Sequence, residues 1–202
     1  FEGDLEPFGF RPCLDREGLS CVWNAVVLHQ RAALCVRFRD HRGIRDGRVA
    51  ALAPVLPRPP GVTIHDADGL LVVPGLIDLH THVYWGGTSL GIDADEFCRT
   101  SGVTTSVDTG SAGPGNFLGF RKHVIEKSQA RILAYLHVSF AGIYAFSART
   151  MVGESEDIRM MAPAEAAEVA DANRDVIVGI KVRVGRHASG DQGTAPLDMA
   201  LQ

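Results

Sequence analysis

A His-x-His pair, His80 and His82, ends an apolar run that begins at Val73. In an extended strand, residues two positions apart point to the same side, so Asp78, His80 and His82 share one face. Two imidazoles on one face can bind one metal ion. The sequence therefore predicts a metal site at the end of this strand.

Lys181 is the second residue of unusual chemistry, because it lies inside the apolar run of residues 175–184. Alternation along a strand puts it on the same face as Ile177, Gly179 and Arg183. Both faces of a parallel sheet are normally covered, so an inward amine must be neutralised, paired or modified. Taken by itself, Lys181 is best interpreted as an ion-paired strand residue.

The run over residues 73–82 opens with Pro-Gly and closes with His-x-His, and this frame resembles the first barrel strand of the amidohydrolase superfamily. The flanks at residues 68–73 and 84–88 are similar to its deacetylase and dihydroorotase-like branch. The resemblance implies an α/β fold, the first part of a (β/α)8 TIM-type barrel. It also implies a metal-dependent amidohydrolase that cleaves an amide or cyclic amide C–N bond, including deacetylation, with metal-activated water.

The same resemblance implies the cofactors: two divalent metal ions, expected to be zinc, and a carbamylated lysine. His80 and His82 would bind the more buried ion, and Lys181 as a carbamate would bridge it to the second. Family members take two more histidines and a general-base aspartate from later strands. The resemblance therefore assigns no catalytic base among the 202 residues.

Two polar residues near the ends of other predicted strands are candidates for substrate binding. His137 lies near the strand end at which barrel sites gather, although a lone strand histidine is more often a hydrogen-bonded core residue. Asp108 precedes a glycine-rich loop, and it could touch substrate or cap that loop. Cys98 lies in a predicted helix without a local histidine, so we interpret it as a packed thiol.

Strand and helix patterns alternate after residue 73, as in a parallel sheet. They predict strands near 76–82, 103–109, 131–140 and 175–184, with helices near 93–100, 116–127 and 163–173. Residues 73–202 would then form about four βα units, half the number in a TIM-type barrel. We expect a fragment that lacks part of the active site. The alternative is a non-catalytic, truncated or degenerate half-barrel.

The segment before the barrel divides in two. Residues 44–72 are expected to be a remnant of a small β-domain, with a hairpin turn at Asp46-Gly47 and a short strand over residues 62–66. Residues 1–43 do not resemble the family. Their apolar block, residues 23–36, could be helix or strand, because its periodicity does not decide.

Composition limits the partners. The formal charge of −4 offers no basic surface for nucleic acid or anionic membranes, and no apolar run approaches the length of a membrane span. The four cysteines lack C-x-x-C spacing, which favours free thiols in a reducing compartment. We therefore expect a cytoplasmic protein with a small acyl or cyclic amide substrate, able to self-associate through exposed sheet edges.

Overall fold

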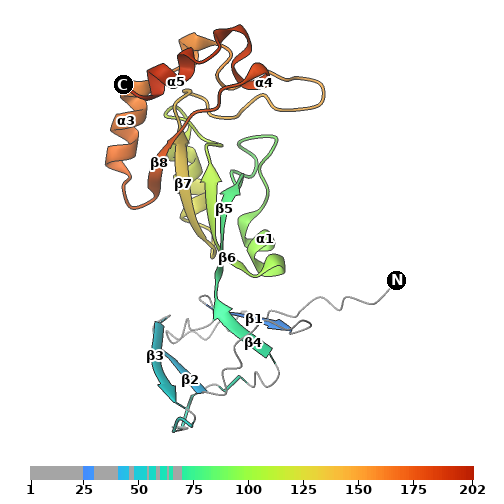
Figure 1. Ribbon diagram of the computed structural model, residues 1–202, viewed down its shortest axis with the longest axis vertical. Coiled ribbons are helices and arrows are strands. Elements are labelled where there is room, and N and C mark those ends of the chain that lie inside the picture. The colour runs from blue at the N-terminus through green and yellow to red at the C-terminus, as the bar shows by residue number, and fades with distance from the viewer. Residues whose placement is uncertain are drawn as a thin grey trace, which may run out of the picture. The chain divides into compact units, whose positions relative to one another are not determined.

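The computed structural model of this chain describes two compact units, residues 1–76 and 77–202 (Figure 1). The description covers residues 25–29, 41–45, 48–53, 55–57, 60–62, 64–65 and 70–202. Each unit is considered by itself. The predicted metal-binding and substrate-binding residues all belong to the second.

In the first unit, two antiparallel strand pairs are described. The pairs are β1 (Ala25–His29) with β4 (Leu70–Pro74), and β2 (His41–Arg45) with β3 (Arg48–Ala53). Arg45 pairs with Arg48, which confirms the predicted hairpin, although its turn residues lie outside the described part. The block that could be helix or strand contains strand β1.

One prediction for this unit is wrong where it can be checked. Val62, Ile64 and His65 form no strand, whereas a short strand was expected over residues 62–66. Val62 and Ile64 are both more than half exposed. An apolar, β-branched run predicts a strand only if a neighbouring strand is available to pair with it.

The second unit is built on a four-stranded parallel sheet in the order β5-β6-β7-β8 (Figure 1). The strands are β5 (Leu76–Thr81), β6 (Val103–Thr109), β7 (Arg131–His137) and β8 (Ile177–Lys181). All four predicted strands are confirmed, and so is the α/β class. Strand β7 ends three residues before the predicted boundary at 140, so His137 is its last residue.

Helices connect and follow these strands. They are α1 (Ala94–Ser101), α2 (Phe117–Phe120) with the π-helical turn η1 (Arg121–Ile125), η2 (Ile158–Met160), α3 (Pro163–Ala172), α4 (Arg186–Ser189), η3 (Gly190–Gln192) and α5 (Ala195–Ala200). Asp93 caps α1 by accepting a hydrogen bond from Glu96 N–H, and α1 ends at Gly102 with φ of 75°. Among the described helices, none is long and apolar enough to cross a membrane.

The core lies between one face of the sheet and the helices. Ile132, Ala134 and Leu136 of β7 pack into the same buried cluster as Phe117 and Phe120 of α2. Burying a side chain of this size contributes about 1.5–3 kcal/mol. The intervening residues of β7, which include His137, therefore point away from the helices.

Candidate functional site

His80 and His82 lie at the carboxyl end of β5, and the side chain of Thr81 between them is buried on the opposite face. Thr81, between them, donates its hydroxyl to Val107 O at 3.0 Å and accepts a hydrogen bond from the Thr109 hydroxyl at its own carbonyl, at 3.3 Å. Thr81 is therefore tied to β6, and the two imidazoles point to the other side. Their ring centroids are 5.7 Å apart and their planes are nearly perpendicular.

The His82 ring is half-buried and held by a hydroxyl. Its Nδ1 lies 3.0 Å from Ser111 Oγ. Burial lowers the pKa of His82 to about 4, with smaller contributions from the charges of His80, Lys181 and Arg183. The ring is therefore neutral near pH 7, which is the form that binds metals. With Nδ1–H donating to Ser111, the Nε2 lone pair is available to a metal ion.

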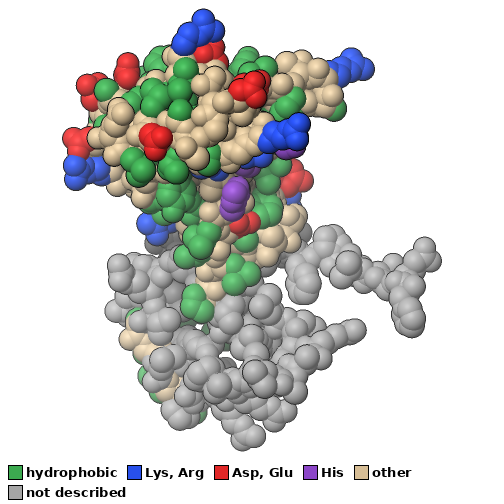
Figure 2. Space-filling model, turned by 45° about the horizontal axis from the view of Figure 1, so that its top comes forward, with side chains coloured by type: hydrophobic (Ala, Val, Ile, Leu, Met, Phe, Trp, Pro, Cys, Tyr) green, Lys and Arg blue, Asp and Glu red, His purple; other side chains and the backbone are tan. Residues whose placement is uncertain are grey.

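His80 is the more accessible member of the pair. Its side chain is exposed, and imidazoles reach the surface of this unit in Figure 2. Asp78, which shares its predicted face, accepts a hydrogen bond from the His80 backbone N–H at 3.0 Å. Asp78 thus stabilises the local backbone of the strand that carries both histidines.

Asp108 organises the loop beneath His82. Its carboxylate is fully buried and accepts hydrogen bonds from the backbone N–H groups of Val83 and Ser111, both at 2.8 Å. Burial raises the pKa of Asp108, while these bonds oppose the rise. The carboxylate joins the segment after β5 to the loop that presents Ser111. Of the two roles predicted for Asp108, these contacts match the loop cap.

Lys181 is the last residue of β8 and is paired in register with His137 of β7. Its Nζ donates to the Thr109 carbonyl at 3.3 Å. Burial lowers the pKa of Lys181 and Arg183 lowers it further, while the carboxylates of Glu154 and Asp108 oppose the shift. The amine is therefore easier to deprotonate than an exposed lysine.

An ion pair between a buried carboxylate and a partly exposed guanidinium acts on Lys181. The Glu154 side chain is only 2% exposed, and its Oε1 accepts a hydrogen bond from Arg183 Nη1 at 3.3 Å. The Arg183 guanidinium also lies 6.0 Å from the centre of the Phe146 ring. Glu154 carried no signal in the sequence, because it comes from the long connection between β7 and α3.

His137 is completely buried at the end of β7. Its Nδ1 accepts a hydrogen bond from the Ser139 backbone N–H at 2.9 Å, while its Nε2 has no hydrogen-bond partner among the described residues. Burial lowers its pKa to about 3, helped by the charges of Lys181 and Arg183. The fold thus keeps this ring neutral near pH 7.

The predicted residues gather at the carboxyl ends of β5, β6, β7 and β8. No group of three or more His, Cys, Asp and Glu side chains in the described part of the chain is arranged to hold a metal ion. Any such site therefore needs an additional ligand, and Lys181 is the candidate that the sequence predicted. Sequence reasoning missed Ser111, although its place directly after Asp108-Thr109-Gly110 could have indicated it.

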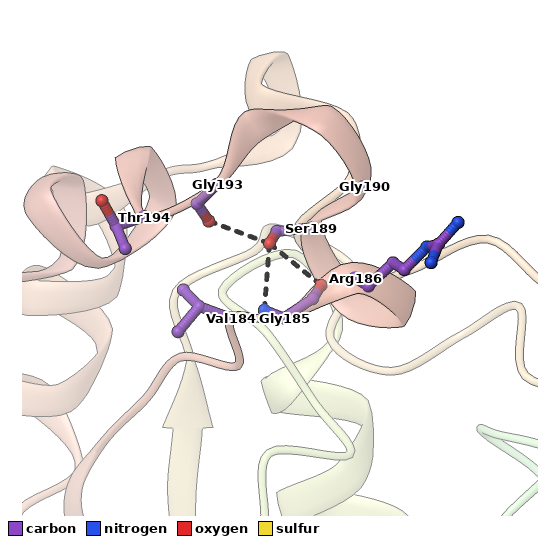
Figure 3. A pocket seen from close by; sticks show the side chains of 7 residues that line it. All are labelled: Val184, Gly185, Arg186, Ser189, Gly190, Gly193 and Thr194. Carbon is purple, nitrogen blue, oxygen red and sulfur yellow. Dashed lines mark hydrogen bonds between the residues drawn. The ribbon is translucent and has the colours of Figure 1, made fainter.

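A pocket of about 430 Å³ lies in the segment that follows β8 (Figure 3). It is lined by Val184, Gly185, Arg186, Ser189, Gly190, Gly193 and Thr194. The Ser189 hydroxyl, which accepts from Gly185 N–H and contacts the carbonyls of Gly185 and Gly193, holds this segment together. None of the predicted metal-binding residues lines this pocket.

Cys98 behaves as the packed thiol that the sequence predicted. It is 5% exposed, and its Sγ lies 3.5 Å from the Ser106 hydroxyl. Burial raises the pKa of the thiol. A protonated, buried thiol is a poor nucleophile.

Comparisons with known proteins show what this chain is similar to in sequence and in fold. No protein-family profile matches the chain. A deacetylase of Agrobacterium fabrum (strain C58) is 38% identical over 154 residues, which are 76% of this chain and 37% of that protein. A deacetylase of Brucella anthropi is 39% identical over 155 residues, 77% of this chain and 38% of that protein.

Two solved structures are similar in fold. The crystal structure of an adenine deaminase matches with a TM-score of 0.71 and 28% identity, over 82% of this chain and 43% of that one. The crystal structure of a dihydroorotase matches with a TM-score of 0.55 and 38% identity, over 63% of this chain and 39% of that one. The chain therefore spans less than half the length of each of these four proteins.

Proposed function

We propose that this chain supplies metal-binding residues of a hydrolase that cleaves an amide or cyclic amide C–N bond. The chain is a relative of the amidohydrolase superfamily, and it matches less than half the length of each similar protein. Deacetylation is the first activity to test, since two similar proteins are deacetylases. The observation that carries the proposal is the pair His80 and His82 at the end of β5, with His82 neutral and its Nδ1 held by Ser111.

The donor chemistry fits a divalent cation. Neutral imidazole nitrogens suit zinc, and the hydroxyl on His82 Nδ1 resembles the outer partners that orient metal-binding histidines. His80 and His82 would hold one ion, and Lys181 would join it to a second. Cations bound there would lower the pKa of a bound water and polarise a substrate carbonyl.

Lys181 would contribute as a carbamate. The neutral Nζ amine attacks the carbon of CO2, so that a C–N bond forms, one C=O electron pair moves to oxygen, and Nζ loses a proton to water. The lowered pKa of Lys181 raises the fraction of neutral amine that can react. The product is an anionic oxygen ligand in place of an ammonium group.

Substrate contact is proposed for the residues that face the same end of the sheet. His137 is the candidate whose Nε2 has no hydrogen-bond partner among the described residues, whereas the Asp108 carboxylate is occupied by backbone N–H groups. The proposed substrate is a small acyl or cyclic amide compound. Self-association through the edges of the sheet stays a prediction.

Metal analysis tests the proposal. Purified protein equilibrated with zinc and then desalted is expected to retain zinc, measured by mass spectrometry of the element. The double variant His80→Ala, His82→Ala should lose it. A matched control is His123→Ala, His187→Ala, which removes two exposed histidines from other elements and should keep the wild-type content. Wild-type zinc content in the first double variant would remove the basis of the proposal.

A second candidate function is that these 202 residues have no catalytic activity of their own. It is favoured by one observation, that the described residues do not assemble three His, Cys, Asp or Glu side chains around an ion. Hydrolysis of an N-acetyl amino acid by the purified chain, absent in the His80→Ala, His82→Ala variant, would contradict this alternative.

A further inference from the structure

The Nε2 atom of His137 is a buried polar atom without a hydrogen-bond partner among the described residues. The residue is 0% exposed. Buried polar groups are nearly always hydrogen-bonded, so an exception needs an explanation, such as a group that binds there. The position of His137, at the carboxyl end of β7, makes a binding role the first explanation to consider.

The hydrogen bond on the other ring nitrogen fixes what Nε2 can do. A backbone N–H can only donate, and Ser139 N–H points at His137 Nδ1 at 2.9 Å. Nδ1 must therefore carry its lone pair, and the neutral ring keeps its proton on Nε2. A nitrogen that carries a proton cannot ligate a metal ion. His137 is thus arranged to donate a hydrogen bond through Nε2, unlike His82.

The neighbours of the ring place this donor beside Lys181. His137 and Lys181 are register partners on adjacent strands. A Cβ added at Gly110 would lie 2.7 Å from Lys181 Cγ and 3.2 Å from His137 Cδ2, the carbon bonded to Nε2. The imidazole carbon next to Nε2 and the stem of Lys181 therefore both pack closely against Gly110, which places the two side chains next to each other.

The charges around the His137 ring favour an anion. Lys181 and Arg183 both act on His137 as positive charges. Two carboxylates act on Lys181, and both have partners: Glu154 is bonded to Arg183, and Asp108 accepts from the backbone N–H groups of Val83 and Ser111. An N–H donor near Arg183, and near Lys181 while that amine is unmodified, is best matched by an acceptor with negative charge.

We propose that His137 is a hydrogen-bond donor of fixed tautomer for an anionic oxygen held next to Lys181. Two sources offer this chemistry: the carbamate formed on Lys181, and the carboxylate of a bound molecule. The inference deepens the proposed function, because it assigns a donor to the same site. The tautomer of His137 does not depend on metal binding, so the proposal for His137 and the proposed metal-dependent function can fail separately.

The first experiment reads the tautomer in metal-free protein labelled with ¹⁵N-histidine. Two-bond ¹H–¹⁵N correlation spectra near neutral pH are expected to show His137 with its proton on Nε2, and His137→Gln identifies the signal by its loss. A proton on Nδ1, or a charged ring, would overturn the proposal. Absence of zinc binding by the wild-type protein would instead count against the proposed function alone.

The second experiment identifies the anion with two probes. ¹³C-bicarbonate reports the carbamate through its carbonyl signal, which Lys181→Arg should abolish, and sodium acetate stands for a carboxylate. Replacing His137 by Leu removes the donor, whereas His137→Gln keeps an N–H donor on a side chain of similar reach. Loss of a hydrogen bond to a charged group is expected to weaken the interaction about ten-fold or more.

The outcomes separate the two sources. If the acceptor is the carbamate, its occupancy falls in His137→Leu and is partly restored in His137→Gln, and acetate affinity is unchanged. If the acceptor is a carboxylate, acetate affinity falls in His137→Leu and the carbamate signal stays. Equal behaviour of wild type and His137→Leu with both probes would overturn the proposal. Where the carbamate signal stays, zinc content should also stay at the wild-type level in both variants, because His137 is not itself a ligand.

Discussion

The ends of β5 and β7 each present a buried or half-buried histidine, yet the two rings are held in opposite ways. His82 places Nδ1 against the hydroxyl of Ser111, at 3.0 Å. His137 places Nδ1 against the backbone N–H of Ser139, at 2.9 Å. A hydroxyl can accept or donate, whereas an N–H can only donate. The hydroxyl at the end of β5 therefore permits the tautomer that leaves a lone pair for a metal ion, whereas the N–H at the end of β7 leaves only a proton for an acceptor.

This difference shows that the role of a histidine, as metal ligand or as hydrogen-bond donor, depends on what its other ring nitrogen contacts. Burial lowers the pKa of both rings, to about 4 for His82 and about 3 for His137, so charge does not distinguish them. Position does not distinguish them either, because both stand at carboxyl ends of parallel strands, where sites of such folds gather. Four predictions test how far the comparison holds, from the largest expected effect to the smallest.

The largest effect is expected at the crowded end of β7, for Gly110→Ala. The residue has φ of +88°, and its new Cβ would lie 2.7 Å from Lys181 Cγ. Backbone strain and overpacking together should lower the free energy of unfolding by about 2–5 kcal/mol. Urea denaturation followed by circular dichroism measures it.

A matched control separates strain from crowding. Gly86 also has positive φ, +77°, but an added Cβ would meet nothing within 4 Å. Gly86→Ala should therefore show only the cost of the backbone conformation, about 1–2 kcal/mol. If both glycines cost the same, the close approach of Lys181 and His137 at Gly110 is not energetically important.

The Ser111→Ala variant tests the end of β5. Removing the hydroxyl leaves His82 Nδ1 without the partner that orients the ring, and zinc affinity should fall by roughly 10- to 100-fold. Competition with a chromophoric chelator measures the dissociation constant. The control is Ser139→Ala, since it removes a buried hydroxyl from the end of β7 but keeps the N–H that contacts His137. Equal losses in both variants would contradict the comparison.

The pH dependence of stability compares the two rings directly. The pKa of His137 is about 3 in the folded chain and near 6.5 in the unfolded chain. Between these values the unfolded chain takes up a proton that the folded chain does not. The free energy of unfolding therefore falls as the pH falls below 6.5, by up to about 1.4 kcal/mol per pH unit for this residue.

Replacing each ring by glutamine separates the two contributions. His137→Gln should remove its share of the acid sensitivity over the whole window, and His82→Gln only down to its own pKa of about 4. Urea denaturation at several pH values between 3 and 7 provides the measurement. A pH slope that neither variant reduces would show that the rings are not kept neutral by the fold.

The smallest effect is expected at the opposite end of the sheet, where polar contacts are exposed. Arg121 binds Asp175 through two hydrogen bonds, at 2.9 and 2.8 Å, and lowers the pKa of that carboxyl. This contribution to stability is present above the carboxyl's ordinary pKa and is lost as the pH falls through the lower, folded-state value. Asp175 is 63% exposed, so water and salt weaken the pair.

Asp175→Asn should therefore lower the melting temperature only slightly near neutral pH. The difference from wild type should shrink in high salt and vanish in acid, as followed by thermal denaturation. Asp171→Asn, which removes the exposed partner of Arg174, is the matched control and should lower the melting temperature as slightly near neutral pH. A large loss from Asp175→Asn alone would mean that this end of the sheet contributes more than surface pairs normally do.

Much of the architecture could be read from periodic patterns. The four strands of the sheet and the helix over residues 163–173 followed from apolar runs, turn residues and Pro163, because these signals are local. Boundaries were less accurate. Strand β8 covers only Ile177–Lys181 of the predicted 175–184, since residues beyond Lys181 leave the sheet to form the segment that lines the pocket.

Only part of the candidate site could be predicted from such local sequence patterns. His80, His82 and Lys181 were singled out because two histidines spaced two residues apart and an amine within an apolar run can be recognised in the sequence alone. Ser111 and Glu154 were not, because each acts through a contact with a residue 29 positions away. The role of Asp108 stayed open until its backbone partners were known.

The order of residues along the chain was enough to predict alternating strands and helices, a histidine pair at the end of one strand and an amine inside another. Only the tertiary structure decided what faces each ring: a backbone N–H keeps the proton of His137 on Nε2, whereas a hydroxyl at His82 Nδ1 permits the tautomer with a free Nε2 lone pair. Hydrogen-bond direction is a property of pairs brought together by folding, and the amino-acid sequence specifies the members of a pair without showing that they meet.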